Sequence, residues 1–167
     1  MKALFIGRFQ PFHNGHLKVI QKASKEYDEI IIGIGSSQYR DALENPFTSE
    51  ERELMIQRSL DEINIKNYRI VLIPDIHNPP KWVEHVLSIF SDFDVVLANS
   101  SFTKKLFIEA GYNVEKTELY DRDFLCGKEI RRRINDDEKW QNLVPSEVSK
   151  LISKVDGMNR IKKLFLT

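Results

Sequence analysis

Short runs of apolar residues alternate with stretches of helical periodicity along most of the chain. Four runs are continuously apolar and end at Gly, Pro or Asn, which is typical of strands buried on both faces of a sheet. They occupy residues 2–7, 29–35, 68–74 and 94–99. A weaker strand is expected at 113–118.

Helical stretches are predicted between these runs, at residues 15–26, 48–60, 80–91 and 101–110. For the second helix, Thr48 or Ser49 is the expected N-cap. Leu54, Ile56 and Leu60 are expected on its buried face. The alternation of strands and helices predicts an α/β fold, a Rossmann-like, doubly wound parallel sheet with helices on both faces.

After residue 126 the chain reads as mainly helical, with stretches at 128–137, 145–155 and 158–165. We expect this C-terminal segment, residues 126–167, to pack on the α/β core of residues 1–125. The length of 167 residues and the 41% of hydrophobic residues then suit a single domain with its own core.

Composition and charge exclude several classes of protein. Lys plus Arg and Asp plus Glu both number 25, so the net charge of +0 provides no overall field for nucleic acid or an anionic membrane. Cys126 is the only cysteine, which excludes a disulfide framework and a Cys-x-x-Cys zinc site. Nowhere do eighteen apolar residues run together. We expect a cytoplasmic protein whose anion site, if it has one, is local.

The candidate ligand site lies at the end of the first predicted strand. In an open parallel sheet, ligands bind at the carboxyl ends of the strands, where the winding reverses. Gly7 would let a phosphate approach the backbone, and a helix that begins near Asn14 or Gly15 would point free N–H groups at the same place. The chain has no P-loop motif, and residues 33–35 lack the third glycine of a dinucleotide fingerprint.

His13 and His16 lie three positions apart where this helix begins. Three interpretations are open: a helix cap with a surface neighbour, two ligands of a metal, or two N–H donors to a phosphate. A metal site needs a third ligand, and no other histidine or acidic residue has a suitable spacing. The nearby Gly7 and the forked guanidinium of Arg8 favour the phosphate interpretation.

Residues 7–16, GRFQPFHNGH, resemble the H-x-G-H signature of the nucleotidyltransferase superfamily related to class I aminoacyl-tRNA synthetases. The full form is similar to that of archaeal-type nicotinamide-mononucleotide (NMN) adenylyltransferases. CGKEIR at 126–131 lies where family members carry S-[SG]-T-x-[IV]-R. Further similar segments, in the expected order, are GSSQ (35–38), NPFTSEER (45–52), DIHNPPKWVEHV (75–86) and DRDFLCGKEIRRR (121–133).

The resemblance implies transfer of the adenylyl group of ATP to NMN, with in-line attack by the NMN phosphate and formation of NAD and pyrophosphate. That phosphate is already ionised, so the enzyme must supply alignment and stabilisation of charge rather than a general base. Mg²⁺ is the expected cofactor, carried by the ATP phosphates and not by protein side chains. The catalytic residues implied are Arg8, His13, His16 and Arg131.

The resemblance also implies binding residues for the two substrates. For ATP they are Gly7, Arg8, Phe9, Gln10, His13, His16, Ala98, Asn99, Lys128 and Arg131. For NMN they are Ser36, Asp75, Ile76 and Trp82. The indole of Trp82 would stack on the cationic nicotinamide ring. The alternative for Trp82 is an ordinary core or interface aromatic.

Three positions depart from the family pattern. Cys126 and Lys128 stand where relatives carry serine and threonine, and Glu44 stands where they often carry arginine, which leaves Arg40 as a possible substitute. In the arginine run 131–133 only Arg131 is expected to face a ligand. The other two are expected to be solvated or paired with acids, the candidates being Asp136, Asp137 and Glu138.

Two alternative functions remain open. One is a related transferase with another acceptor or nucleotide, of the phosphopantetheine, FMN or cytidylyl type, against which the Trp82 segment argues. The other is a non-catalytic nucleotide-binding sensor, against which the intact His13 and His16 argue. Family analogy also suggests a homo-oligomer, a hexamer. Neither nucleic acid nor a membrane is an expected partner.

Overall fold

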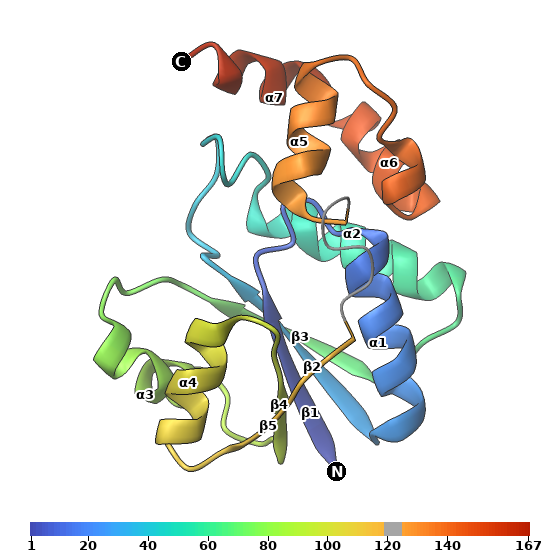
Figure 1. The fold of residues 1–167 in the computed structure, drawn as a ribbon. Helices are drawn as coiled ribbons and strands as arrows, with labels where there is room; N and C mark the ends of the chain where they lie inside the picture. Colours follow the sequence, from blue (N-terminus) through green and yellow to red (C-terminus); the bar gives the residue numbers. More distant parts are fainter. Residues whose placement is uncertain (119–124) are drawn as a thin grey trace.

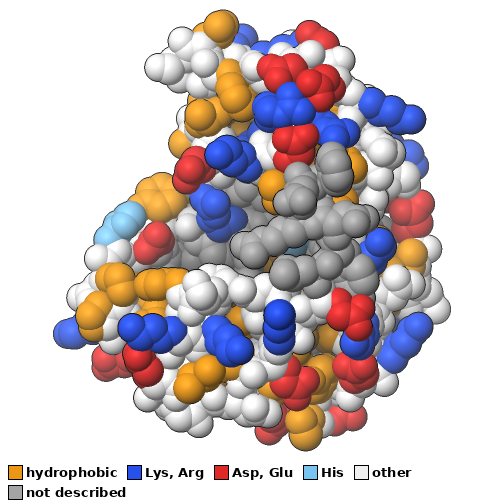
Figure 2. Space-filling model, viewed as in Figure 1, with side chains coloured by type: hydrophobic (Ala, Val, Ile, Leu, Met, Phe, Trp, Pro, Cys, Tyr) orange, Lys and Arg blue, Asp and Glu red, His pale blue; other side chains and the backbone are white. Residues whose placement is uncertain are grey.

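The computed structural model describes residues 1–118 and 125–167 (Figure 1). Positions 121–124 of the predicted motif at 121–133 therefore lie outside the described residues. On the face shown in Figure 2, acidic and basic side chains are interspersed, as a net charge of zero suggests. Within the described ranges, no helix is both long and apolar enough to cross a membrane.

Five parallel strands form one sheet in the order β3-β2-β1-β4-β5, which confirms the predicted doubly wound fold. Phe5 in the central strand is in register with Ile32 on one side and Leu97 on the other. The last two strands are shorter than predicted. The strands are β1 (Lys2–Gly7), β2 (Glu29–Gly35), β3 (Tyr68–Ile73), β4 (Val95–Leu97) and β5 (Asn113–Glu115).

Helices cover both faces of the sheet, as Figure 1 shows. Successive side chains of a strand point to opposite faces, so Ile30 and Ile32 pack with one pair of helices and Ile31 with the other pair. The first pair is α1 (Asn14–Glu26) and α2 (Ser49–Glu62), and the second pair is α3 (Pro79–Ile89) and α4 (Ser101–Glu109).

At the start of α2 the N-cap is Thr48, one of the two predicted candidates, and it forms a capping box with Glu51. The Thr48 hydroxyl accepts from the Glu51 N–H at 3.1 Å, and the Glu51 carboxylate accepts from the Thr48 N–H at 3.0 Å. Ile56 and Leu60 are fully buried, as predicted. The prediction for Leu54 is wrong, because this residue is 39% exposed. It lies two positions from Ile56, and residues two apart lie on opposite sides of a helix.

The C-terminal segment packs on the same face of the sheet as α2. Its apolar residues Ile130, Val148 and Ile152 belong to the hydrophobic cluster that also contains Met55. In Figure 1 these helices lie beyond the carboxyl end of β1. The elements are α5 (Gly127–Asn135), a short 3₁₀ turn η1 (Gln141–Leu143) that the sequence pattern did not predict, α6 (Ser146–Lys154) and α7 (Gly157–Phe165).

Candidate active site

Two cavities meet at the carboxyl end of β1. This strand lies between β2 and β4, so the winding of the sheet reverses beside it, where α/β sheets bind ligands. The first cavity, which we call the histidine cavity, has a volume of about 220 Å³ and is lined by His13, His16, Ala98 and Asn99, among others. The second, the tryptophan cavity, has a volume of about 700 Å³ and is lined by Arg8, Ser36, Asp75 and Trp82, among others. Their shared walls are Ile6, Gly7, Ser100 and Thr103.

His13 and His16 bind each other's backbone at the start of α1. The Nδ1 atom of His13 accepts from the backbone N–H groups of Gly15 at 3.1 Å and His16 at 3.3 Å. The Nδ1 atom of His16 accepts from the His13 N–H at 3.2 Å. A backbone N–H can only donate, so both Nδ1 atoms are unprotonated and the neutral rings carry hydrogen on Nε2. Each ring therefore has one Nε2–H donor that these contacts leave unused.

Both imidazoles are held in the neutral form. Burial lowers the pKa of His13 to about 4, and His13 is only 6% exposed. Burial also lowers the pKa of His16 well below its usual value, and the nearby His13 lowers it further. The rings stack with centroids 3.5 Å apart. A cap role and a donor role are thus compatible in His13, because the cap uses Nδ1 and leaves Nε2.

The loop between β1 and α1 is fixed by contacts within the protein. The Gln10 side-chain amide donates to the Phe47 carbonyl at 2.9 Å and accepts from the Phe47 N–H at 3.0 Å. Arg131 donates from Nη1 to the Gln10 carbonyl at 2.7 Å. The Phe9 ring packs edge-on against His16, with centroids 4.8 Å apart. The histidines thus stand on a loop that distant parts of the chain hold in place.

Three residues predicted to contact ATP therefore lie behind the lining of the site and support it. Phe9, Gln10 and Arg131 are 1%, 3% and 6% exposed, and none of them lines either cavity. Burial lowers the pKa of Arg131, with a further contribution from the positive charge of Arg8. Lys128 is exposed near the start of α5 and also lines neither cavity.

Ala98 and Asn99, both predicted to bind ATP, follow β4 and line the histidine cavity. The Asn99 amide nitrogen donates to the Thr117 hydroxyl. Its Oδ1 atom is buried and has no hydrogen-bond partner among the described residues. A buried acceptor without a donor is costly, so this atom marks a place where a ligand's N–H group would be favoured.

The tryptophan cavity collects most of the residues predicted to bind NMN. Trp82 is half-buried and packs edge-on against Phe107, with centroids 5.8 Å apart. The backbone of Asp75 is fixed by the side chain of Gln38, which accepts from its N–H at 2.9 Å and donates to its carbonyl at 2.8 Å. Ile76 is half-buried and is not among the lining residues.

Comparison with known proteins identifies the family of this chain. The cytidylyltransferase-like family model matches residues 4–133. A nicotinamide-nucleotide adenylyltransferase of Methanococcus aeolicus is 48% identical over 98% of this chain and 95% of its own length. The enzyme of the same name from Archaeoglobus fulgidus is 43% identical over 98% of this chain and 97% of its own length. The chain belongs to the nicotinamide-nucleotide adenylyltransferase family.

A solved structure shares the fold of this nicotinamide-nucleotide adenylyltransferase family member. It is a bifunctional NMN adenylyltransferase/ADP ribose pyrophosphatase from Francisella tularensis, crystallised with AMP and a Mn ion. The TM-score is 0.80 and the identity 25%, over 98% of this chain. This chain spans about half of that protein, 51% of its length.

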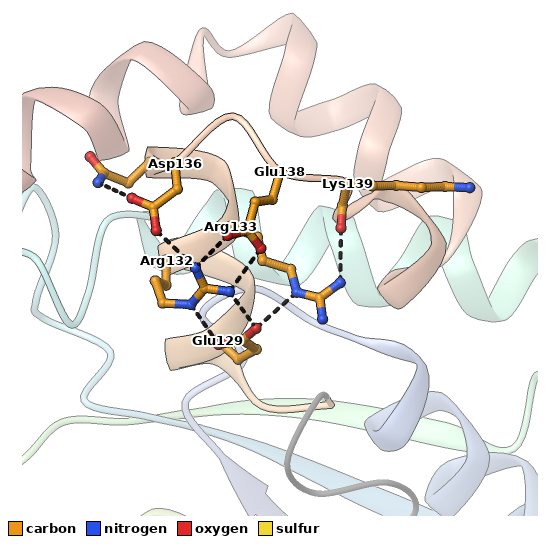
Figure 3. Close-up of polar contacts among 7 residues, drawn as sticks. Glu129, Arg132, Arg133, Asp136, Glu138 and Lys139 are labelled. Carbon is orange, nitrogen blue, oxygen red and sulfur yellow. Dashed lines mark hydrogen bonds and ion pairs between the residues drawn. The ribbon is translucent and has the colours of Figure 1, made fainter.

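In this family member, two arginines of the 131–133 run are engaged in ion pairs away from the cavities (Figure 3). Arg132 binds the carboxylates of Glu129, Asp136 and Glu138, and Arg133 binds Glu129. The two guanidiniums lower the pKa of Glu129 to about 2. The predicted pairing with Asp136 and Glu138 is confirmed. The third candidate, Asp137, pairs instead with Lys162.

Two features of the site of this adenylyltransferase family member were missed by sequence reasoning. Arg52 is fully buried and binds five backbone carbonyls at the ends of β1, β2 and the loop before α2. The available signal was its position on the buried face of α2, three residues before Met55. Glu44 pairs with Arg8 at 3.3 Å, so the departure from the family pattern places an acid beside an arginine that lines the tryptophan cavity. Arg40 pairs instead with Asp41.

Proposed function

We propose that this protein transfers the adenylyl group of ATP to NMN and releases NAD and pyrophosphate. The observation that carries the proposal is the meeting of two cavities at Gly7, beside two imidazoles that each have an Nε2–H donor to spare. A direct transfer needs two nucleotides with their phosphates side by side. The names of relatives 48% and 43% identical over nearly the whole chain support this reaction and these substrates.

ATP occupies the histidine cavity in this proposal. The adenine ring lies against Ala98 and Asn99, and an adenine N–H would satisfy the unpaired Asn99 Oδ1 atom. The α-phosphate then lies near Gly7, within reach of His16, and the rest of the phosphate chain lies near His13. Lys128, exposed in the first turn of α5, is the proposed ligand of the terminal phosphates.

NMN occupies the tryptophan cavity. Its pyridinium ring stacks on Trp82, where the aromatic face attracts a cation. The Asp75 carbonyl, which has a second lone pair beyond the bond from Gln38, accepts from the carboxamide, and Ser36 binds on the β2 side of the cavity. Arg8 lines the tryptophan cavity beside Gly7, where the cavities meet, and there binds phosphate.

The chain contributes alignment and charge stabilisation to the reaction. The NMN phosphate oxygen attacks the α-phosphorus, the bond to the pyrophosphate oxygen breaks, and negative charge develops on the oxygens around the α-phosphorus. The Nε2–H of His16 donates to that charge, and His13 and Arg8 donate to the neighbouring phosphates. Neutral imidazole donors suit this role because they stabilise new charge without a proton transfer. Arg131, Gln10 and Phe9 contribute by fixing the loop that carries these donors.

We propose Mg²⁺ as the cofactor, carried into the site by the phosphates of ATP. Among the described residues, no three His, Cys, Asp or Glu side chains are grouped closely enough to hold a metal ion. The proposed ion is therefore bound mainly by substrate and water. The ion supplies neutralisation of charge on the leaving pyrophosphate.

Incubation of the purified protein with ATP, Mg²⁺ and a panel of acceptors tests the proposal. The panel contains NMN, nicotinic acid mononucleotide, phosphopantetheine and FMN, with CTP in place of ATP as a further arm. NAD and pyrophosphate should form in equal amounts with NMN. A dinucleotide from another acceptor alone would support the related-transferase alternative. Binding of ATP and NMN without pyrophosphate release would support the sensor alternative.

Assembly and location remain predictions. A homo-oligomer, a hexamer by family analogy, is checked by light scattering on the purified protein. The cytoplasmic location rests on the single cysteine and is checked by fractionation of the source cells.

A further inference from the structure

Arg52 is a fully buried arginine whose partners are all backbone carbonyls. Its Nη1 donates to the carbonyls of Arg8 and Gly35, both at 2.9 Å. Its Nη2 donates to Ser36 at 3.2 Å and Ser37 at 3.5 Å, and its Nε donates to Thr48 at 3.2 Å. A guanidinium has five N–H donors, so this set of five carbonyls uses every one of them.

The charge of Arg52 has no carboxylate partner. Among the described residues no acidic group forms an ion pair with it, although it is the largest fully buried side chain. Burial lowers its pKa to about 10, so the group stays charged at neutral pH. A buried charge is costly unless hydrogen bonds compensate it. Backbone carbonyls of three separate segments supply that compensation, which fixes those segments relative to one another.

The segments that Arg52 joins form part of the tryptophan cavity. Arg8, Gly35 and Ser36 line that cavity, and none of the five carbonyl-bearing residues lines the histidine cavity. Two of the carbonyls directly precede residues with left-handed backbone, Phe9 with φ 52° and Ser36 with φ 48°. A non-glycine residue in this region is strained and persists only where its surroundings hold it.

We propose that Arg52 is a positioning residue for adenylyl transfer, which holds Phe9 and Ser36 in left-handed conformations and thereby sets Arg8 and Ser36 along the NMN side of the site. This inference rests on the proposed function for its substrate. Arg52 does not touch the substrate and acts through the backbone that it binds. Its effect should therefore fall on NMN far more than on ATP.

Arg160 offers a matched control. Its guanidinium binds Glu51 at 2.6 and 2.9 Å and the carbonyls of Pro46 and Val155, so it also anchors the start of α2. It lines neither cavity. Loss of the Arg160 guanidinium should lower the free energy of unfolding without moving the ends of β1 and β2.

The test compares Arg52→Lys with Arg160→Lys. Lysine keeps the charge but has three donors, so at least two of the five carbonyls lose their partner. Urea unfolding, NMN binding by calorimetry, and kcat and KM for both substrates are measured on each folded variant. We expect Arg52→Lys to weaken NMN binding about tenfold and to lower kcat, with the KM for ATP within about twofold of wild type. Arg160→Lys should lose stability and keep both KM values within about twofold.

The proposal is overturned if Arg52→Lys binds NMN and turns over as the wild type does, or if both substrates are affected equally. If Arg52→Lys does not fold, Arg52→Gln, which keeps one amide donor group, takes its place. Failure of both to fold would make Arg52 a residue of the fold and not of the site. A wild type that binds NMN but forms no NAD would contradict the proposed function, while the calorimetry would still test positioning.

Discussion

The two cavities that meet at Gly7 provide different means of binding an anion. The described lining of the histidine cavity contains no lysine or arginine, and its donors include two neutral imidazoles. The tryptophan cavity is about three times larger and contains Arg8, Asp75 and His77. Arg8 is exposed and pairs with Glu44, so its charge is available to a ligand only in competition with that acid.

The two cavities differ because the negative charges that they bind arise at different stages of the reaction. The phosphate of NMN is charged before it binds, so a full positive charge attracts it in the ground state. The additional charge around the α-phosphorus develops only in the transition state, where fixed neutral donors are most effective. The histidine cavity is thus suited to catalysis and the tryptophan cavity to recognition of the acceptor.

The largest expected effect is that of His16→Ala. Loss of one preorganised donor to developing charge costs on the order of 3 kcal/mol, so kcat should fall about 10²-fold or more while ATP still binds. Steady-state kinetics and ATP calorimetry measure the two quantities. His85→Ala is the control, because His85 binds the Pro74 carbonyl and lines neither cavity. A kcat of His16→Ala within a few-fold of wild type would mean that His16 does not stabilise the transition state, and the catalytic role of the histidine cavity would be contradicted.

The second prediction concerns the charge state of the histidine cavity. The pKa of His13 is about 4 in the folded protein against an ordinary value of 6.5, so the unfolded chain takes up a proton that the folded ring excludes. The free energy of unfolding should therefore be highest above about pH 6.5 and decline as the pH falls toward 4. By pH 5 the loss from His13 is about 2 kcal/mol.

Urea unfolding at several pH values measures this slope. His13→Asn is the matched control, because asparagine accepts the same backbone N–H groups as a helix cap but does not titrate. Its stability should depend less on pH than that of the wild type. An unchanged slope would mean that another group titrates and that the imidazoles are not held neutral by burial.

Trp82→Ala tests the tryptophan cavity. Loss of stacking on a cationic ring removes roughly 0.5 to 2 kcal/mol, so the KM for NMN should rise about 2- to 30-fold with the KM for ATP nearly unchanged. Trp82→Phe should recover part of the loss. Trp140→Phe is the control, since Trp140 is 3% exposed in the C-terminal core and lines neither cavity. An equal rise in the KM values for NMN and ATP would mean that Trp82 stabilises the fold and does not stack on the nicotinamide ring.

Glu44→Gln should have the smallest effect. The Arg8–Glu44 pair is exposed, and such pairs contribute about 0 to 1 kcal/mol. Freeing Arg8 should lower the KM for NMN by up to about fivefold in dilute buffer, and the gain should shrink in high salt because salt screens exposed charges. Glu109→Gln makes the same charge change on α4, away from both cavities, and should leave the KM unchanged. A higher KM for Glu44→Gln would show that Glu44 assists binding.

The sequence by itself determined the order of elements and the position of the site. Apolar runs and helical periodicity predicted the five strands and the helices around them, because these patterns depend on residues that are neighbours in the chain. The motif at 7–16 and the position of Gly7 at a strand end located the cavities for the same reason. Trp82, Ser36 and Asp75, which were predicted to bind NMN, line one cavity, since each lies at or just beyond a strand end or at a helix start.

Only the tertiary structure decided which polar groups remain without a partner in the protein and are available to bind a ligand. Gln10 and Phe47 are 37 positions apart and Arg131 and Gln10 are 121 apart, yet their hydrogen bonds use the groups that sequence reasoning had assigned to ATP. Arg52 likewise joins segments from residues 8 to 48. A buried carbonyl must find a donor, and the donor that reaches it depends on how distant segments pack. The residue type alone therefore could not distinguish an arginine for phosphate from an arginine for the backbone.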